Sequence, residues 1–79
     1  MRVLNLYTTS SCHLCETAQA LITPLLAAHH LSLRLLEISD SDGLIERYGV
    51  RIPVLRLEGS DLELGWPFNE QSFLEFIKA

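Results

Sequence analysis

Two cysteines separated by two residues, Cys12 and Cys15, constrain this 79-residue chain more than any other feature. They follow an apolar, β-prone run and a loop of small hydroxyl residues, and they begin a segment with helical periodicity. Two cysteines are too few for a disulfide-stapled scaffold. A C-x-x-C spacing at the junction of a strand and a helix instead indicates thiol redox chemistry or metal binding.

The hydrophobic pattern predicts four strands and three helices in the order β-α-β-α-β-β-α. The expected strands cover residues 3–7, 33–38, 53–58 and 61–64, and the expected helices cover 12–29, 44–48 and a segment after Asn69 whose apolar face is Phe73, Phe76 and Ile77. The first two strands should be parallel with a right-handed crossover, and the last two should form an antiparallel hairpin. We therefore expect one α/β domain over residues 1–79, with a four-stranded mixed sheet and helices on both faces.

The sequence also predicts three local details, at a proline in the first helix, at the end of the second helix and in the turn of the hairpin. Pro24 lacks a backbone donor, so we expect a kink or break near residues 21–23. Gly49 is expected at the C′ position of the second helix, with Val50 supplying the hydrophobic contact beyond it. Gly59-Ser60 is expected to form a two-residue hairpin turn of the II′ kind. Alternation in this hairpin places four leucines on one face, namely Leu55, Leu57, Leu62 and Leu64.

Charge and hydropathy argue against several classes of function. Residues 1–57 carry five basic and five acidic groups, and residues 58–79 carry five acids and only Lys78, which gives the net charge of −4. No basic stripe is visible, so we expect no nucleic-acid partner. The apolar runs are far shorter than the roughly 20 residues that span a bilayer, and the segment after Arg2 lacks the pattern of a secretory signal. We expect a cytoplasmic monomer that contacts no membrane.

The position of Cys12 at the start of a helix favours its thiolate. Unpaired backbone N–H groups and the positive end of the helix dipole stabilise an anion there, so its pKa should fall below the free value of about 8.5. Cys15 lies one turn further on and on the same side, from where it can resolve a mixed disulfide. We therefore predict that Cys12 attacks and Cys15 resolves. His13 either adds positive potential near the sulfur or is a solvated loop residue.

Other uses of the two cysteines remain open. Zinc needs four ligands, and the other candidates are His13, between the cysteines, and His29 and His30, roughly 20–25 Å away at the far end of the helix. Since these do not complete a site, we expect no metal in a single chain. An iron–sulfur cluster shared between two chains, or a pair of inert buried cysteines, are the remaining alternatives.

The chain resembles the glutaredoxins, and more closely the short bacterial glutaredoxin-like proteins. The matching segments are Cys12-His13-Leu14-Cys15, Ser39-Asp40-Ser41-Asp42 and 48–55, with Ile52-Pro53 placed 38 residues after Cys15. The resemblance implies a thioredoxin-like fold in which Pro53 is cis and packs beside the cysteines. It also implies that the backbone of Ile52 pairs with an extended substrate, as in β-augmentation.

The same resemblance brings two further side chains toward the site. Trp66 either lines the substrate groove or fastens the last helix to the sheet. Arg51 either attracts an anionic substrate or favours the Cys12 thiolate, or it is an exposed charge at a strand edge. We expect no bound cofactor, and glutathione is the candidate reductant.

Our sequence-based hypothesis is a thiol–disulfide oxidoreductase acting on disulfide-bearing proteins or glutathione mixed disulfides. The alternative of another class is a binding or adaptor module that keeps the fold without turnover. It is motivated by departures from the glutaredoxin pattern: His13-Leu14 between the cysteines, and Leu64-Gly65-Trp66 with one glycine and no acid following.

Overall fold

The protein is built around a four-stranded mixed sheet. The computed structural model describes residues 2–78, and its strands are β1 (Arg2–Thr8), β2 (Leu31–Glu37), β3 (Val54–Leu57) and β4 (Glu63–Gly65). The spatial order is β2-β1-β3-β4. β1 and β2 are parallel and β3 and β4 are antiparallel, as the sequence predicts. β1 and β3 also pair in antiparallel fashion, an arrangement for which the sequence analysis made no prediction.

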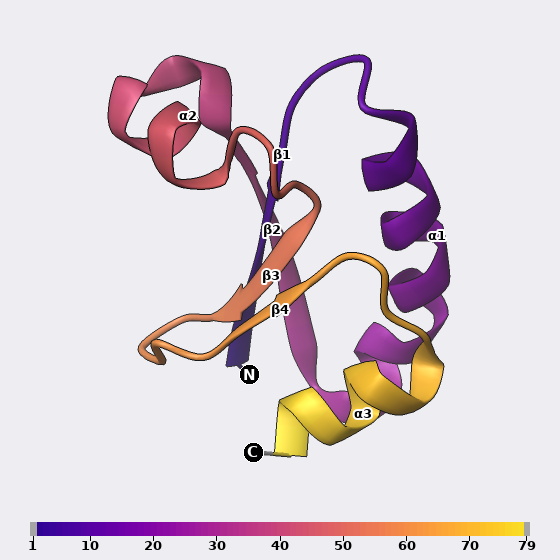
Figure 1. Ribbon diagram of the computed structural model, residues 1–79. Helices are drawn as coiled ribbons and strands as arrows, with labels where there is room; N and C mark the ends of the chain where they lie inside the picture. Colours follow the sequence, from indigo (N-terminus) through magenta and orange to yellow (C-terminus); the bar gives the residue numbers. More distant parts are fainter. Residues whose placement is uncertain (1, 79) are drawn as a thin grey trace.

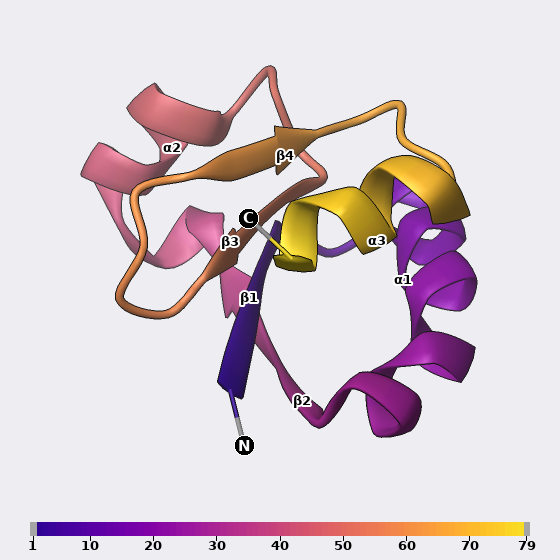
Figure 2. The ribbon, with the colours of Figure 1, turned by 90° about the horizontal axis from the view of Figure 1, so that it is seen from below.

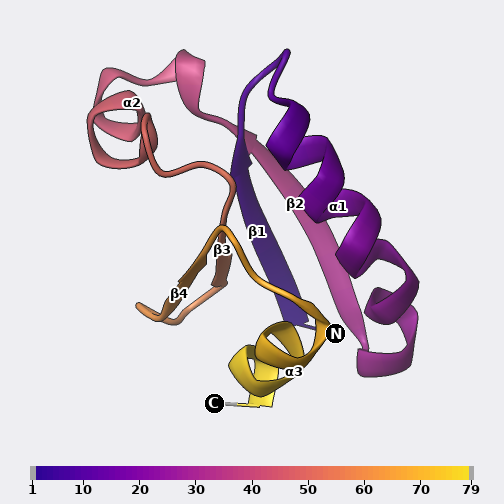
Figure 3. The same cartoon turned by 45° about the vertical axis from the view of Figure 1, so that its right-hand side comes forward.

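The helices cover both faces of this sheet. They are α1 (His13–Leu26), α2 (Asp42–Tyr48) and α3 (Glu70–Lys78), with short 3₁₀ turns at Ala27–His29 and Ile38–Asp40. α1 and α3 lie together on one face and α2 lies on the other (Figures 1 and 2). α1 runs alongside β1 and β2 (Figure 3). The α/β thioredoxin-like fold predicted from the sequence is therefore confirmed.

Each face of the sheet has its own apolar core. The larger core, between the sheet and α1 and α3, consists of Leu4, Leu6, Ala18, Ile22, Leu31, Leu55, Leu57, Phe68, Phe73 and Ile77. The smaller core, beneath α2, consists of Tyr7, Ile38, Tyr48 and Val54. Successive residues of a strand point to opposite faces, so β1 contributes to both cores. Burying a side chain of this size contributes about 1.5–3 kcal/mol, and the two cores therefore fix α1 and α2 on opposite faces.

The first helix does not break where the sequence predicted. It continues through Pro24 to Leu26 and then tightens into the 3₁₀ turn that ends at His29. Ala18 and Ile22, before Pro24, are fully buried, and Leu25 and Leu26, after it, pack against the larger core, so the helix stays on the sheet although proline removes one hydrogen bond. The predicted end of the segment near His29 is right. The predicted break at residues 21–23 is wrong, and the alternative of a kink there stays a prediction.

The second helix begins two residues earlier than expected. The Ser41 hydroxyl caps it by accepting the Leu44 N–H at 3.3 Å. Gly49 has right-handed dihedral angles and Val50 is fully exposed, so the predicted C′ arrangement is wrong. Glycine is required for a different reason, because a Cβ on Gly49 would lie 2.5 Å from the Ile45 carbonyl oxygen.

The β3–β4 hairpin has a wider connection than the predicted two-residue turn. The Ser60 N–H donates to the Leu57 carbonyl at 3.0 Å, with Gly59 at φ +85° in the third position of the turn. A positive φ at that position favours glycine, and Gly59 therefore stands one position later in the turn than expected, third instead of second. Residues 58–62 lie outside the paired strands, which leaves Leu62 exposed and not on the predicted apolar face.

The last helix matches its prediction. The Asn69 side-chain oxygen accepts the Ser72 N–H at 2.8 Å, and Phe73 and Ile77 are buried. Among residues 2–78, no helix has the length and apolar character needed to cross a bilayer.

Candidate functional site

The cysteine pair lies where β1 passes into α1. Cys12 is the N-cap, with extended dihedral angles of −91° and 99°, and the helix begins at His13. The two sulfurs form a disulfide, and the Cα atoms are 5.2 Å apart. The Cys15 N–H donates to the Cys12 Sγ at 3.1 Å. A free amide of the first helical turn is thus directed at the sulfur that the sequence identifies as the nucleophile.

The two cysteines differ in accessibility. Cys12 is half-buried, whereas Cys15 is only 3% exposed. A substrate sulfur approaching from solvent therefore meets Cys12 first. This arrangement agrees with an attacking Cys12 and a resolving Cys15, roles that stay predictions.

The loop before Cys12 is held by a residue that the sequence analysis missed. Glu37, at the end of β2, accepts the Ser10 N–H at 3.0 Å and the Ser39 N–H at 3.1 Å. Hydrogen bonds from Thr9 and Ser39 hold the pKa of the Glu37 carboxyl below its usual value, although desolvation opposes them. The role of Glu37 could have been predicted from the strand register, because Glu37 is the parallel partner of Thr8, the last residue of β1 before the loop to Cys12.

Strand register brings the other predicted segments to the same end of the sheet. Tyr7 pairs with Val54 in antiparallel register, so Pro53, the residue before Val54, lies at the carboxyl end of β1. The loop that leads to Cys12 leaves β1 at this end, after Thr8. Figure 1 shows the β1–α1 and α2–β3 loops at this end. The Ile52–Pro53 peptide bond is cis, as the resemblance implied. The Pro53 carbonyl accepts the Trp66 N–H at 3.1 Å, which brings the fourth strand's exit to the same place.

Ile52 can offer a substrate only part of its backbone. Its N–H donates to the Tyr48 carbonyl at 3.0 Å, while its carbonyl accepts no backbone hydrogen bond from residues 2–78. A paired extended substrate would therefore donate to Ile52 and could not accept from it without breaking the bond to Tyr48. The pairing role predicted for Ile52 remains a prediction, and this geometry limits it to one hydrogen bond.

Trp66 is half-buried and packs edge-to-face on Phe68, with ring centroids 5.1 Å apart. It also contacts the larger core. These contacts support its role in fastening the segment before α3 to the sheet, and the exposed remainder of the ring leaves the groove-lining role as a prediction.

The two charged candidates have partners of their own. His13 is exposed, and its Nδ1 lies 3.6 Å from the Glu16 Oε2, on the next turn of α1. The Arg51 Nη2 is 2.7 Å from the Glu63 Oε1, and its guanidinium lies over the Tyr48 ring at 5.3 Å. Substrate binding by either residue therefore has to compete with a contact already made.

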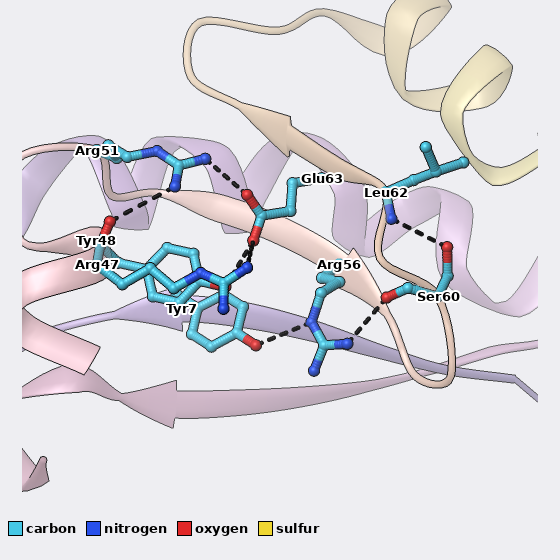
Figure 4. A network of polar contacts seen from close by, with 8 residues as sticks. All are labelled: Tyr7, Arg47, Tyr48, Arg51, Arg56, Ser60, Leu62 and Glu63. Carbon is cyan, nitrogen blue, oxygen red and sulfur yellow. Dashed lines mark hydrogen bonds and ion pairs between the residues drawn. The ribbon is translucent and has the colours of Figure 1, made fainter. Parts of the chain in front are cut away.

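Arg51 belongs to a larger group of polar residues, which we call the tyrosine–arginine cluster (Figure 4). Its members are Tyr7, Arg47, Tyr48, Arg51, Arg56 and Glu63. The rings of Tyr7 and Tyr48 are stacked with centroids 4.0 Å apart. The Tyr48 hydroxyl donates to Glu63, and Arg47 approaches the same carboxylate at 3.7 Å. This cluster joins α2 to β1, β3 and β4.

The cluster shifts the protonation equilibria of its central pair. Burial raises the pKa of the Tyr48 hydroxyl, and the hydrogen bond to Glu63 raises it further. Burial alone would also raise the pKa of the Glu63 carboxyl, but hydrogen bonds from Tyr48 and Arg51 outweigh it, so this pKa lies below its usual 4.5. The folded structure therefore favours the Glu63 carboxylate and the neutral Tyr48 phenol.

Metal ligands do not gather in the part of the chain that the structure describes. Within residues 2–78, no group of three or more His, Cys, Asp or Glu side chains is arranged to hold an ion. The site consequently consists of a disulfide at a helix start, the Pro53 segment beside it, and the side chains that hold both in place.

Comparison with known proteins agrees with this geometry. The family model described as "Glutaredoxin-like domain (DUF836)" matches residues 3–78. The crystal structure of protein XcR50 from X. campestris is similar with a TM-score of 0.76 at 33% identity, and covers 95% of each chain. Its solution structure has a TM-score of 0.80 at 32% identity, covering 99% of this chain and 94% of the other.

A more distant structural neighbour, a malarial protein, has a TM-score of 0.72 at 12% identity, covering 99% of this chain and 94% of the other, and shows likeness of fold alone. No curated protein matches the chain. The family match over nearly the whole sequence, with the disulfide-bonded cysteine pair at the start of α1, shows that this chain belongs to the glutaredoxin-like domain family.

Proposed function

We propose that this chain is a thiol–disulfide oxidoreductase that cycles between a Cys12/Cys15 dithiol and the disulfide between them. The observation that carries the proposal is the Cys15 N–H directed at the Cys12 Sγ, 3.1 Å away, in the first turn of α1. The same amide stabilises a thiolate at that position in the reduced protein, because hydrogen bonds to an anion favour its charged form.

The reaction proceeds in two exchanges. The Cys12 thiolate attacks one sulfur of a substrate disulfide, forms a mixed disulfide, and releases the other substrate sulfur as a thiolate that takes up a proton. Cys15 then loses its proton and attacks the Cys12 Sγ, which forms the intramolecular disulfide and releases the second substrate thiol. Two electrons pass from the protein to the substrate.

A thiol donor closes the cycle. Two glutathione molecules reduce the Cys12–Cys15 disulfide and leave as glutathione disulfide, so that electrons and protons balance. A cytoplasmic setting supplies such a donor, since that compartment keeps thiols reduced. We propose disulfide-bearing proteins or glutathione mixed disulfides as substrates, with the Ile52 carbonyl accepting one backbone hydrogen bond from the bound chain.

The test compares variants in the reduction of insulin and of a glutathione mixed disulfide. Cys12→Ser should lower both rates to that of the thiol reagent alone, and Cys15→Ser should accumulate a mixed disulfide detectable by mass spectrometry. Thr23→Ser, an equally small change at the exposed far part of α1, should retain the original rate. Equal activity in the original protein and Cys12→Ser would refute the proposal. A folded protein with no turnover and no trapped partner would favour the binding module instead.

A further inference from the structure

Arg56 is a half-buried cation without an acidic partner. Its Nε donates to the Tyr7 hydroxyl at 3.0 Å and its Nη1 donates to the Ser60 carbonyl at 2.9 Å, and both acceptors are neutral. No carboxylate of residues 2–78 lies within ion-pair distance of it. Charges withdrawn from water are normally paired, so an unpaired one calls for an explanation.

The acid expected to pair with Arg56 is engaged elsewhere. Glu63 is its direct cross-strand neighbour in the β3–β4 register, where opposite charges normally pair. The Glu63 carboxylate is instead held by Tyr48 and Arg51, with Arg47 beside it (Figure 4). Arg56 therefore keeps a full positive charge, and two of its three nitrogens are fixed by neutral acceptors.

Arg56 is one of the residues that line a cavity. The cavity has a volume of about 210 Å³ and lies between α2 and the β3–β4 connection; its lining residues are Tyr7, Leu44, Arg47, Tyr48, Arg56 and Asp61. This volume is below that of pockets for drug-sized ligands, so its occupant is compact. Arg47 supplies a second guanidinium at the rim, with its side chain 66% exposed.

The charge balance of this region favours an anion. Among the residues that line the cavity, Arg47 and Arg56 are positive and Asp61 is negative, which leaves one positive charge in excess in a chain whose net charge is −4. Glu58 also acts on Arg56 through its charge, but its carboxylate is paired with Arg34. Asp61 makes no ion pair with a described residue and lies in the cavity wall, where it opposes an incoming anion. It limits the affinity without reversing the sign of the local charge.

We propose that this cavity binds a compact oxyanion, the carboxylate or phosphate group of a small molecule. Arg56 supplies a guanidinium held by two hydrogen bonds, and Arg47 supplies an exposed one. Guanidinium groups suit planar or tetrahedral oxyanions. The cavity lies on the α2 face of the sheet, whereas the cysteines begin α1 on the opposite face. Binding is therefore independent of the thiol chemistry.

The test titrates the complete oxidised chain with inorganic phosphate and, separately, with acetate. Nitrogen-detected NMR of the arginine side chains should show a saturable shift at the Arg56 Nε. The anion that saturates this shift at the lower concentration shows whether the cavity prefers a phosphate or a carboxylate group. Arg56→Met should weaken binding about tenfold or more, because it removes a hydrogen bond to a charged group. Arg34→Met, which removes the arginine paired with Glu58 on the same sheet, should change the affinity less than about twofold.

A second variant protects the test against misfolding of Arg56→Met. Asp61 is exposed, and its side chain makes no hydrogen bond within residues 2–78. Asp61→Asn removes the charge that opposes an anion, and it should tighten binding severalfold. The double variant Cys12→Ser/Cys15→Ser should bind like the original protein. Absence of a saturable shift in both the original protein and Asp61→Asn, or equal weakening by Arg34→Met and Arg56→Met, would overturn the proposal.

Discussion

Replacing Glu63 by Gln tests how the chain holds the segment that leads to Pro53. Its carboxylate is only 15% exposed and accepts hydrogen bonds from Arg51, at 2.7 Å, and from Tyr48. The amide keeps the shape and an acceptor oxygen but loses the charge. Hydrogen bonds to charged groups contribute roughly 1.5–3 kcal/mol each and about half that when neutral. Two weakened hydrogen bonds and the weaker attraction to Arg47 predict that the free energy of unfolding falls by about 2 kcal/mol.

The dependence of this loss on pH follows from the lowered pKa of Glu63. A carboxyl whose pKa falls on folding stabilises the native state above its unfolded pKa, near 4.5, and that contribution is lost as the pH drops through the folded value. Glu63→Gln should therefore be less stable by about 2 kcal/mol at pH 7. The two proteins should converge as the carboxyl becomes protonated below pH 4.5.

The measurement is urea unfolding followed by circular dichroism between pH 7 and pH 3. With a slope of roughly 1 kcal/mol per molar urea for so small a protein, the midpoint at neutral pH should fall by about 2 M. Glu75→Gln, an exposed carboxylate with one hydrogen bond, from Gln71, is the matched control and should shift the midpoint little. A difference that persists undiminished at pH 3 would mean that Glu63 acts through packing, and the charge argument would be wrong.

Three further predictions concern the site and the cores. In the reduced protein, iodoacetamide should modify Cys12 before Cys15, which is 3% exposed, and peptide mass spectrometry that found the reverse order would contradict the assigned roles. Phe73→Ala, at a fully buried position, should cost about 3–5 kcal/mol in urea unfolding, and a loss below about 1 kcal/mol would show that this core is loosely packed. Gly49→Ala should destabilise by about 1–3 kcal/mol, because the new Cβ meets a carbonyl oxygen at 2.5 Å. Gly43→Ala, whose Cβ would have 3.7 Å of space, should be neutral or stabilising by up to about 1 kcal/mol, and equal effects of the two would refute the steric reason.

The order of elements was predictable because it depends on local periodicity. The apolar run of β1, the three-and-four spacing of α1 and the Asn69 cap are all recognisable without knowledge of the fold. The boundary errors arose where tertiary packing outweighed local preference. α1 passes through Pro24 because Ile22 before it is fully buried and Leu25 and Leu26 after it pack against the larger core. The β3–β4 turn adopts a wider form with Gly59 at a positive φ.

The parts of the site that depend on one segment were also predictable. Cys12 and Cys15 are found by their spacing and by the strand–helix junction alone. Glu37 was missed because its role depends on parallel register, and the predicted β2 began two residues late. A strand starting at Leu31 places Glu37 beside Thr8, where it meets the loop that precedes Cys12.

The polar partners of Arg56 and Glu63 lay beyond sequence reasoning for a different reason. Alternation assigns both residues to the polar side of the hairpin, and their register makes them direct neighbours, which predicts an ion pair. α2 changes this outcome by bringing Tyr48 and Arg51 within hydrogen-bond distance of the same carboxylate. Glu63 cannot both hold the segment before Pro53 and neutralise Arg56. The hydrogen bonds from Arg51 and Tyr48 to Glu63 hold the segment before Pro53, and they are therefore the reason why the positive charge of Arg56 has no acidic partner in the cavity.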